Sequence, residues 1–425
     1  MNSKDSKQII KQIISDLDGL KLHACGIAVS GGSDSMALFH MLADWKSDNK
    51  PKIFVASVDH GLRPESKSEV AFVKKICEKK KVEHTSLTPA THLSNVQGNL
   101  QNNARSARYQ LLRNWAISKN LQCVFLGHTL DDQEENLLMR FFRGSGVDGL
   151  AGMKKKSIRS GVLWVRPLLK FRKEELRNYL RNNNYSWIND PSNDDEKYQR
   201  VKMRKLLEQL KSSSLISPNF VKTSDHMLRA SKLLREKAVS SSKSILSFND
   251  VGQIIFEVEK FSEFFEDTQY RILSGIISWF SGRFYKPRFS KLENIYRKLT
   301  DVRNLKGATL GGTVFKKKNG IVTVTRELAS INENYLIENE KFIWDNRWLI
   351  TLKPGIRVKL YVKPFGLVGS DELKIFIKSD LDKSALATMP MITSDKAIKF
   401  VPLSNMKYDV DIKLLNQDNE FYKFF

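Results

Sequence analysis

The chain has 425 residues, 41% of them hydrophobic, which is enough apolar material for about two to four folded domains. Its 70 lysines and arginines exceed its 47 aspartates and glutamates and leave a formal net charge of +23. That excess favours a polyanionic partner, nucleic acid before an anionic membrane. The three cysteines, Cys25, Cys77 and Cys123, form no C-x-x-C pair, which argues against a zinc ribbon, an iron–sulfur cluster or a disulfide scaffold.

The amino-terminal segment has no feature of a secretory signal. Residues 1–20 form an amphipathic pattern without a continuous apolar stretch. No apolar run in the chain approaches the roughly 18 residues that a membrane-spanning helix requires. Cys25 and Cys123 sit within apolar runs and are expected to be buried core residues. We therefore expect a cytoplasmic protein with reduced cysteines and no membrane partner.

From residue 24 to about residue 190, short apolar runs alternate with segments of helical periodicity. The runs at 24–29, 53–58 and 123–127 have the length and β-branching of strands. A helix is expected over 102–115, with Arg105 and Arg108 on one face. This alternation predicts a doubly wound, mostly parallel sheet, in which ligands bind beyond the carboxyl ends of the strands.

A glycine-rich loop follows the first predicted strand and precedes a predicted helix. Its two glycines let the backbone bend, and amides at a helix N-terminus suit a phosphate group. Its serines add hydroxyl donors, and Asp34 suits a magnesium ion that accompanies phosphates. A serine-capped helix after a glycine turn is the simpler alternative, but the strand, loop and helix together favour phosphate binding. The loop consists of Ser30, Gly31, Gly32, Ser33, Asp34 and Ser35.

Polar residues also follow the second and third predicted strands. Asp59 and His60 end the second strand and can face the same crevice as the glycine loop. Considered without the other motifs, however, this pair is better explained as an Asx turn beside a histidine whose hydrogen bonds are all made within the fold. Asp131 and Asp132 lie in the first turn of a helix, where carboxylates are ordinary caps. His128, four residues before Asp132, is harder to explain as a structural residue and favours a functional site.

The later part of the chain divides into a basic helical block and a strand-rich block. Residues 152–173 hold eight basic and no acidic residues, among them Lys154, Lys155 and Lys156, and residues 197–243 hold twelve basic and three acidic residues. Two apolar helical stripes follow, and Asn319-Gly320 predicts a tight hairpin turn. We expect blocks at 1–215, 216–335 (mostly helical) and 345–425 (small, α+β).

These motifs resemble those of the bacterial tRNA(Ile)-lysidine synthetases, which are N-type ATP pyrophosphatases with a PP-loop. The resemblance covers residues 24–204 densely, and length and domain order support it further on. The long run from Leu130 to Met153 makes it specific to this family. The motifs are, in order, SGGSDS, VDHGLR, NNARSARYQLL, GHTLDDQEENLLMRFFRGSGVDGLAGM, RPLL and DPSN.

The resemblance implies a reaction in two steps on a tRNA(Ile) with a CAU anticodon. ATP adenylylates the C2 oxygen of the wobble cytidine and releases pyrophosphate, which requires positive charge near the phosphates. The amine of free L-lysine then attacks C2 and expels AMP. The product, lysidine, makes the tRNA read AUA instead of AUG. ATP and magnesium are the cofactors that this reaction implies.

The resemblance also implies roles for particular residues. Arg108, His128 and Asp132 would belong to the catalytic centre, with Asp34 on magnesium. The nucleotide would lie on the glycine loop, with Asp59 and His60 nearby. The first block would be the catalytic domain and the second would bind tRNA. RNA contacts are expected from Lys154, Lys155, Lys156, Arg200 and Arg204.

Two departures from the family pattern and several alternatives stay open. Thr129 stands where the family usually has histidine, and Val201 where it usually has asparagine after Arg200. A related tRNA thiolase, acting on cytidine for example, would typically use paired cysteines, and an amidotransferase would need an attached glutaminase. A non-catalytic RNA-binding protein is the alternative outside the enzymes. The sequence allows a homodimer but does not establish one.

Overall fold

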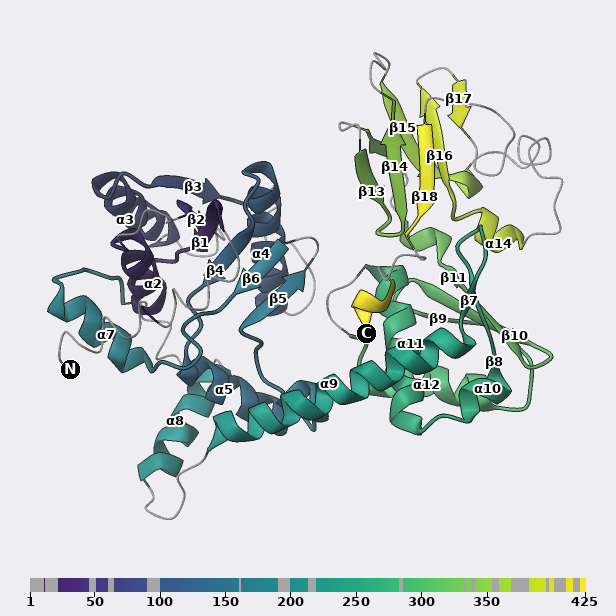
Figure 1. The fold of residues 1–425 in the computed structure, drawn as a ribbon, viewed down its shortest axis with the longest axis horizontal. Helices are drawn as coiled ribbons and strands as arrows, with labels where there is room; N and C mark the ends of the chain where they lie inside the picture. Colours follow the sequence, from purple (N-terminus) through teal and green to yellow (C-terminus); the bar gives the residue numbers. More distant parts are fainter. Residues whose placement is uncertain are drawn as a thin grey trace. The chain divides into compact units, whose positions relative to one another are not determined.

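The computed structural model describes most of the chain and divides it into two compact units, Met1–Ser231 and Lys232–Phe425 (Figure 1). Within the described residues, no helix has both the length and the apolar character needed to cross a membrane. The described residues are 11, 22–45, 51–59, 65–89, 100–159, 162–189, 199–212, 219–282, 286–331, 334–337, 341–353, 359–367, 382–394, 397–400, 410–415 and 421–425.

The first unit contains a six-stranded sheet with the strand order β3-β2-β1-β4-β6-β5. All neighbouring strands are parallel except β5, which pairs antiparallel with β6. This arrangement confirms the predicted mostly parallel sheet and the three predicted strands. The strands are β1 (Ala24–Ala28), β2 (Lys52–Val58), β3 (Glu83–Leu87), β4 (Cys123–Leu126), β5 (Lys156–Arg159) and β6 (Val162–Val165).

Helices cover both faces of this sheet. On one face, Ile27, Val55 and Phe125 pack in a buried cluster with residues of α2, α3 and α7. On the other face, Phe54 and Val124 pack with residues of α4. Because both faces are buried, the central strands are continuous apolar runs in the sequence. These helices are α2 (Ser33–Ala43), α3 (Glu65–Lys79), α4 (Leu100–Ser118) and α7 (Lys173–Asn182).

Further helices follow strand β4 along the chain. Helix α5 packs against α6 and α8, and α9 runs through the boundary between the two units. The helices are α5 (Leu130–Phe141), α6 (Val147–Leu150), α8 (Gln199–Ser212) and α9 (Phe220–Ile245).

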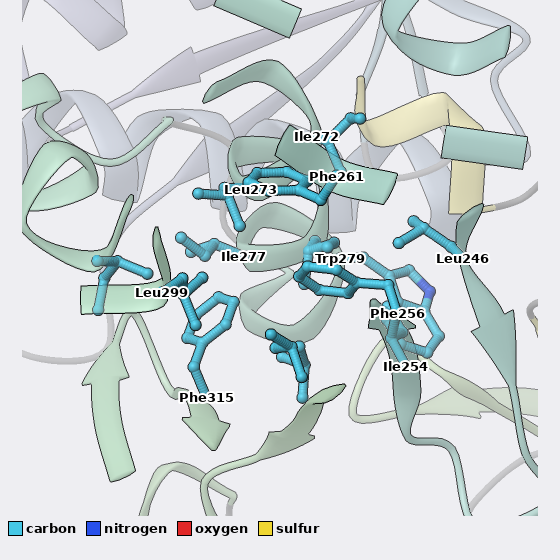
Figure 2. Close-up of a cluster of buried hydrophobic side chains, with 14 of the residues drawn as sticks. Leu246, Ile254, Phe256, Phe261, Ile272, Leu273, Ile277, Trp279, Leu299 and Phe315 are labelled. Carbon is cyan, nitrogen blue, oxygen red and sulfur yellow. The ribbon is translucent and has the colours of Figure 1, made fainter. Parts of the chain in front are cut away.

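The second unit begins with helices packed on a five-stranded antiparallel sheet of order β7-β8-β11-β10-β9. Figure 2 shows the core, where Trp279 and Ile277 of α11 pack against Phe256 and Phe315 of the sheet. The block expected to be mostly helical therefore also contains a complete sheet. Its elements are β7 (Ser247–Phe248), β8 (Ile254–Glu257), α10 (Val258–Ser262), α11 (Glu266–Ser281), α12 (Phe289–Thr300), β9 (Leu305–Leu310), β10 (Thr313–Lys318) and β11 (Ile321–Arg326).

The predicted hairpin turn is confirmed between β10 and β11. These strands pair antiparallel up to Lys318 and Ile321. The turn residues Asn319 and Gly320 have φ angles of 50° and 76°. Asparagine and glycine tolerate this left-handed region better than other residues, so the local sequence fixes the turn.

Two small sheets complete the second unit, with the strand orders β12-β15-β16-β17 and β13-β14-β18. Their shared core includes Trp344, Trp348, Ile350 and Val362. The remaining elements are η3 (Leu328–Ser330), β12 (Tyr335–Leu336), β13 (Lys341–Trp344), β14 (Trp348–Leu352), β15 (Leu360–Pro364), η4 (Phe365–Leu367), α14 (Lys383–Leu386), β16 (Pro390–Ser394), β17 (Ala397–Phe400), β18 (Val410–Leu414) and η5 (Phe421–Phe424).

A buried ion cluster lies in the turn between β13 and β14. The Asp345 carboxylate accepts hydrogen bonds from Arg347 Nη2 at 2.7 Å and from Arg326 Nε at 3.1 Å. The Arg347 side chain is fully buried, and burial and the nearby Arg326 charge lower its pKa, opposed by Asp345. Asp345 therefore compensates two buried guanidinium groups, so removing its charge would be costly.

Candidate active site

The glycine-rich loop joins the carboxyl end of β1 to the N-terminus of α2, as the sequence predicts. Gly31 has a φ of 90°, which favours glycine, and Gly32 caps the helix. The loop is braced from inside, because Ser35 Oγ accepts a hydrogen bond from Ser30 N at 3.2 Å and donates one to the Gly32 carbonyl at 3.1 Å. The first amides of α2 lack partners within the helix and suit an anion.

Gly127 brings the end of β4 against this loop. A Cβ atom added there would lie 3.0 Å from both the Cα and the backbone N of Ser35. A side chain would therefore push the third strand end away from the N-terminus of α2. The sequence prediction named the neighbouring His128 but gave Gly127 no role.

Asp34 is a partly buried carboxylate with an unusually high proton affinity. Burial raises its pKa to about 6, aided by the negative charge of Asp132. The Lys173 cation opposes this rise, as does the hydrogen bond that Ser33 Oγ donates to Asp34 Oδ1 at 2.9 Å. The ionised form of Asp34 is therefore incompletely compensated by the protein.

His128, Arg108 and Asp132 form one electrostatic cluster, although Arg108 comes from α4, His128 from the end of β4 and Asp132 from α5. Burial lowers the pKa of His128, the Asp132 charge opposes this effect, and the nearby arginines, including Arg108, reinforce it. His128 Nδ1 is buried without a hydrogen-bond partner in the described part of the chain. The imidazole is therefore neutral near pH 7 and keeps an unused nitrogen atom.

Arg108 lies partly buried in a region of positive charge. Burial lowers its pKa, and so do the charges of Arg105 and Arg200. The Arg105 guanidinium lies 5.4 Å from the centre of the Tyr109 ring. An accumulation of guanidinium groups beside a helix N-terminus suits a strongly anionic ligand.

Asp132 performs a structural task in addition to facing His128. Its Oδ2 accepts a hydrogen bond from Thr129 N at 2.9 Å, and its backbone N donates to Thr129 Oγ1 at 3.4 Å, which together form a capping box at the start of α5. Burial would raise the pKa of Asp132, but Lys173, His128 and Arg200 hold it well below its usual range. Threonine at position 129, a departure from the family pattern, is thus accounted for as the helix cap.

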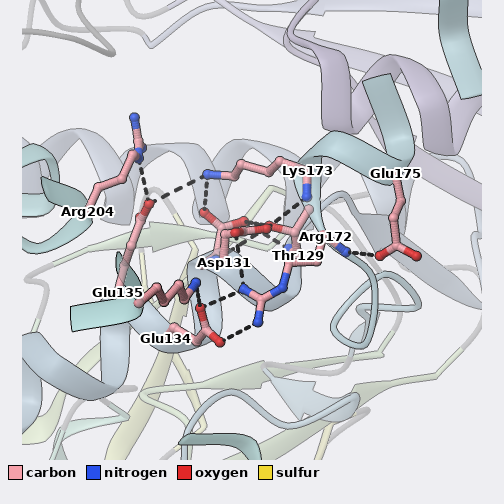
Figure 3. A network of polar contacts seen from close by, with 10 residues as sticks. Thr129, Asp131, Glu134, Glu135, Arg172, Lys173, Glu175 and Arg204 are labelled. Atoms are coloured by element: carbon pink, nitrogen blue, oxygen red, sulfur yellow. Dashed lines mark hydrogen bonds and ion pairs between the residues drawn. The ribbon is translucent and has the colours of Figure 1, made fainter. Parts of the chain in front are cut away.

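A network of ion pairs connects α5 to the start of α7 and to α8 (Figure 3). Glu134 accepts two hydrogen bonds from Arg172, each of 2.7 Å, and one from Lys211 Nζ at 2.6 Å. Glu135 Oε1 accepts from Arg204 Nε at 2.9 Å. Both glutamates are buried, so each depends on these cations for compensation.

Lys173 connects this network to the site. Its Nζ lies 3.2 Å from Asp132 Oδ1 and 3.8 Å from Glu135 Oε1. Burial would lower the pKa of Lys173, but Asp132, Glu135 and Asp34 raise it, so the lysine stays protonated. Sequence reasoning counted Lys173 only within a basic run. The four carboxylates between 131 and 135 were the available signal, because that many acids in a helix need cations nearby.

Asp59 ends β2 and is buried, and it accepts a hydrogen bond from Ser66 Oγ of α3. Part of its role is thus structural, and its contact with a nucleotide stays a prediction. His60 lies outside the described residues, and so does the segment 190–198 that holds the last motif. Val201, the second departure, is buried in α8.

Some residues of the two basic stretches are exposed to solvent, and others are buried or paired with acidic residues of the protein. Lys154 and Lys156 are exposed and Lys155 is half-buried. Arg166, which was counted with them as surface charge, is instead buried and donates to the Lys154 carbonyl at 3.0 Å. Arg204 pairs with Glu135, and Arg200 influences Asp132 and Arg108. RNA contacts of these residues stay predictions.

No group of three or more histidine, cysteine, aspartate or glutamate side chains suited to a metal ion occurs among the described residues. Asp34 is nevertheless a suitable single ligand, because its carboxylate is partly buried and undercompensated. Magnesium commonly binds one or two carboxylates and completes its shell with phosphates and water. The residues present thus fit a magnesium ion that arrives with a nucleotide.

Comparisons with known proteins show which family the sequence resembles. A family profile described as a PP-loop domain matches residues 2–211. A tRNA(Ile)-lysidine synthase from Wolbachia pipientis is 32% identical over 380 residues, covering 88% of each chain. One from Ruegeria pomeroyi is 32% identical over 400 residues, covering 93% of this chain and 92% of the other. A solved U34-tRNA thiolase from Methanococcus maripaludis has a TM-score of 0.45 and 18% identity, covering 54% of this chain and 78% of that one.

The parallel sheet, the glycine loop before α2 and the matching profile define a PP-loop protein with an ATP-binding domain. The similarity to the curated relatives extends over most of the chain and therefore identifies one family among the PP-loop proteins. The chain belongs to the tRNA(Ile)-lysidine synthase family. This confirms the resemblance on which the sequence prediction was based.

Proposed function

We propose that this protein ligates free L-lysine to C2 of the wobble cytidine of a tRNA(Ile) with a CAU anticodon, at the expense of ATP. The proposal rests most directly on the cluster of Arg108, His128 and Asp132 beside the glycine loop that carries Asp34. It combines an anion site, a neutral imidazole and a guanidinium group at one edge of a parallel sheet. Family membership supplies the substrates.

In the first step, the C2 oxygen of cytidine attacks the α-phosphorus of ATP, and pyrophosphate leaves. The amides at the N-terminus of α2 would bind the pyrophosphate, and Asp34 would hold a magnesium ion that neutralises phosphate charge. Arg108 would stabilise charge that develops on the α-phosphate, because a guanidinium can donate two parallel hydrogen bonds to it.

In the second step, the lysine amine attacks C2, the C2–O bond to the adenylyl group breaks, and AMP leaves. The amine must lose protons as the C–N bond forms. The neutral His128, with an unused nitrogen, suits the role of accepting a hydrogen bond from the attacking amine and orienting it. Asp132 would act through its neighbours, because it holds Thr129 and Lys173 and faces the imidazole.

The cysteines favour this ligase over a thiolase that carries sulfur on its own thiols. Cys25, Cys77 and Cys123 are all buried in cores. Burial raises the pKa of Cys77 to about 12 and also raises that of Cys123. A buried thiol that stays protonated is a poor nucleophile and persulfide carrier.

The first test is tRNA-dependent release of pyrophosphate from ATP. Asp34→Ala and Arg108→Ala should each abolish it while the circular dichroism spectrum stays unchanged. Arg113→Ala, on the same helix as Arg108, is the matched control and should keep the activity. Normal pyrophosphate release by either site variant would contradict the site assignment. Pyrophosphate release without any RNA would contradict the proposal that tRNA is the substrate.

A further inference from the structure

Helix α5 ends in two aromatic side chains that face solvent. Phe141 is 64% exposed and Phe142 is 62% exposed, whereas Leu137 and Leu138, one turn earlier, are buried. The two rings lie 6.0 Å apart, with their planes at 77°. Because the rings are nearly perpendicular, their faces point in two directions. Among the residues that the structure describes, neither ring belongs to a buried core cluster, so the described packing does not account for two phenylalanines here.

The surroundings of this aromatic pair are cationic. Arg140 and Arg143 flank it, and no acidic residue occurs from 139 to 147. Arg140 donates to the Gly149 carbonyl at 2.7 Å and Arg143 to Gln199 Oε1 at 2.6 Å. A guanidinium has five N–H donors, so the bond to Gln199 leaves Arg143 with donors for a further acceptor. These contacts also fix both arginines beside the rings.

The loop after the pair is open to an approaching molecule. A Cβ atom added at Gly144 or Gly146 would meet nothing within 4 Å. The backbone between Arg143 and α6 is therefore accessible as well as the two rings. An aromatic pair, fixed arginines and an open glycine backbone together form one surface, 140–146, which is exposed except at the half-buried Arg140 and Ser145.

We propose that this surface, 140–146, binds unpaired nucleotides of the tRNA, with bases stacked on Phe141 and Phe142 and a phosphate on Arg143. The inference rests on the proposed function and adds to it a contact outside the catalytic cluster. Proteins bind single-stranded nucleic acid by this combination of aromatic faces and guanidinium groups. The perpendicular rings suit one base on each ring better than a continuous stack.

Charge argues for RNA rather than a second copy of the chain on this surface. A two-fold dimer would place the surface against itself and bring Arg140 and Arg143 close to their own copies. Such like-charge contacts oppose association, whereas a polyanion is attracted. Phe265 offers a contrast in the second unit, since it is 85% exposed but lies among Glu263, Glu266 and Asp267.

The test measures the dissociation constant of unmodified tRNA by filter binding at several salt concentrations, without ATP. Replacing both phenylalanines with alanine should weaken binding by about 5- to 150-fold for each stacked base lost. The slope of affinity against salt should not change, because no phosphate contact is removed. Phe142→Trp should bind like the wild type and Phe142→Leu like Phe142→Ala, because leucine keeps the apolar character without a π face. Phe265→Ala is the matched control and should change nothing.

Arg143→Gln gives the complementary result, a salt slope reduced by roughly 0.7 for the lost phosphate contact. If the double variant fails to fold, the comparison of Phe142→Trp with Phe142→Leu decides the question alone. Equal tRNA affinity of these two single variants would overturn the inference. So would a double variant that loses self-association in sedimentation but keeps its tRNA affinity. A wild-type protein without lysine transfer would instead contradict the proposed function, so the two failures are distinguishable.

Discussion

Asp34→Asn should stabilise the protein while it abolishes the activity. Burial raises the Asp34 pKa from 3.8 to about 6, so the folded protein binds this proton more tightly than the unfolded chain. The ionised carboxylate is therefore a cost to the fold at neutral pH. A shift of about 2 units, at 1.36 kcal/mol each, makes that cost at most about 3 kcal/mol. Asparagine has nearly the same shape and removes the charge.

The sign of the pH dependence follows from the direction of this shift. The wild type, compared with Asp34→Asn, should lose stability as the pH rises from about 4 to about 6, because Asp34 is then ionised in the unfolded chain but still protonated in the folded protein. Above pH 7 the difference should be constant. Below pH 4 the two proteins should be equally stable, since the carboxyl group is protonated in both folded and unfolded states.

The assay is urea unfolding of the full chain between pH 4 and pH 8, without nucleotide or magnesium. Asp225→Asn is the matched control, because Asp225 is exposed on α9 and its replacement should change stability by less than about 0.5 kcal/mol. ATP with magnesium should stabilise the wild type more than Asp34→Asn. An Asp34→Asn variant that is equally or less stable than the wild type at pH 8 would refute the reasoning.

Three further predictions concern the surrounding charges. Lys173→Met removes the cation beside Asp34 and should raise the Asp34 pKa by about 1 unit or more, moving the acidic limb of pyrophosphate release to higher pH. Lys173→Arg should leave this limb in place, and an unmoved limb in the methionine variant would contradict the assignment. Replacing Lys154, Lys155 and Lys156 with glutamine should weaken tRNA binding and flatten its salt dependence, with ATP affinity nearly unchanged. An unaltered salt slope would identify this run as an ordinary solvated surface. Asp345→Asn leaves Arg326 and Arg347 without their carboxylate and should cost about 3–5 kcal/mol in urea unfolding. Asp411→Asn, at an exposed position, is its control, and equal stability of the two variants would contradict the role of the buried cluster.

The sequence predicted those parts of the fold that local patterns determine. Strands β1, β2 and β4 of the first sheet were visible because burial on both faces makes them apolar throughout. The turn at Asn319 was visible because few residues tolerate its backbone conformation. Strand β3, with the sequence EHTSL, was missed because it lies at the sheet edge and is only partly buried. The short strands β7 and β8 were missed because two to four residues carry little periodicity.

The sequence predicted which motifs form the candidate site, but it did not predict which side chains contact one another there. Periodicity places Asp132 in the first turn of a helix, but it does not reveal that Lys173, 41 residues later, contacts it. The same limit applies to Arg166, which composition counts as surface charge and the structure buries. The packing of elements that are distant in sequence decides which charged side chains are buried. The net charge of the chain contains no information about this packing.

The transfer of radiolabelled lysine to tRNA tests the central claim most directly. The substrate is tRNA(Ile) with a CAU anticodon, compared with the same tRNA whose wobble base is changed to uridine. We predict ATP-dependent incorporation into the cytidine-containing tRNA alone, because a pocket that pairs with cytosine leaves buried polar groups unmet when uracil enters. Equal incorporation into both tRNAs, or none into either, would contradict the account.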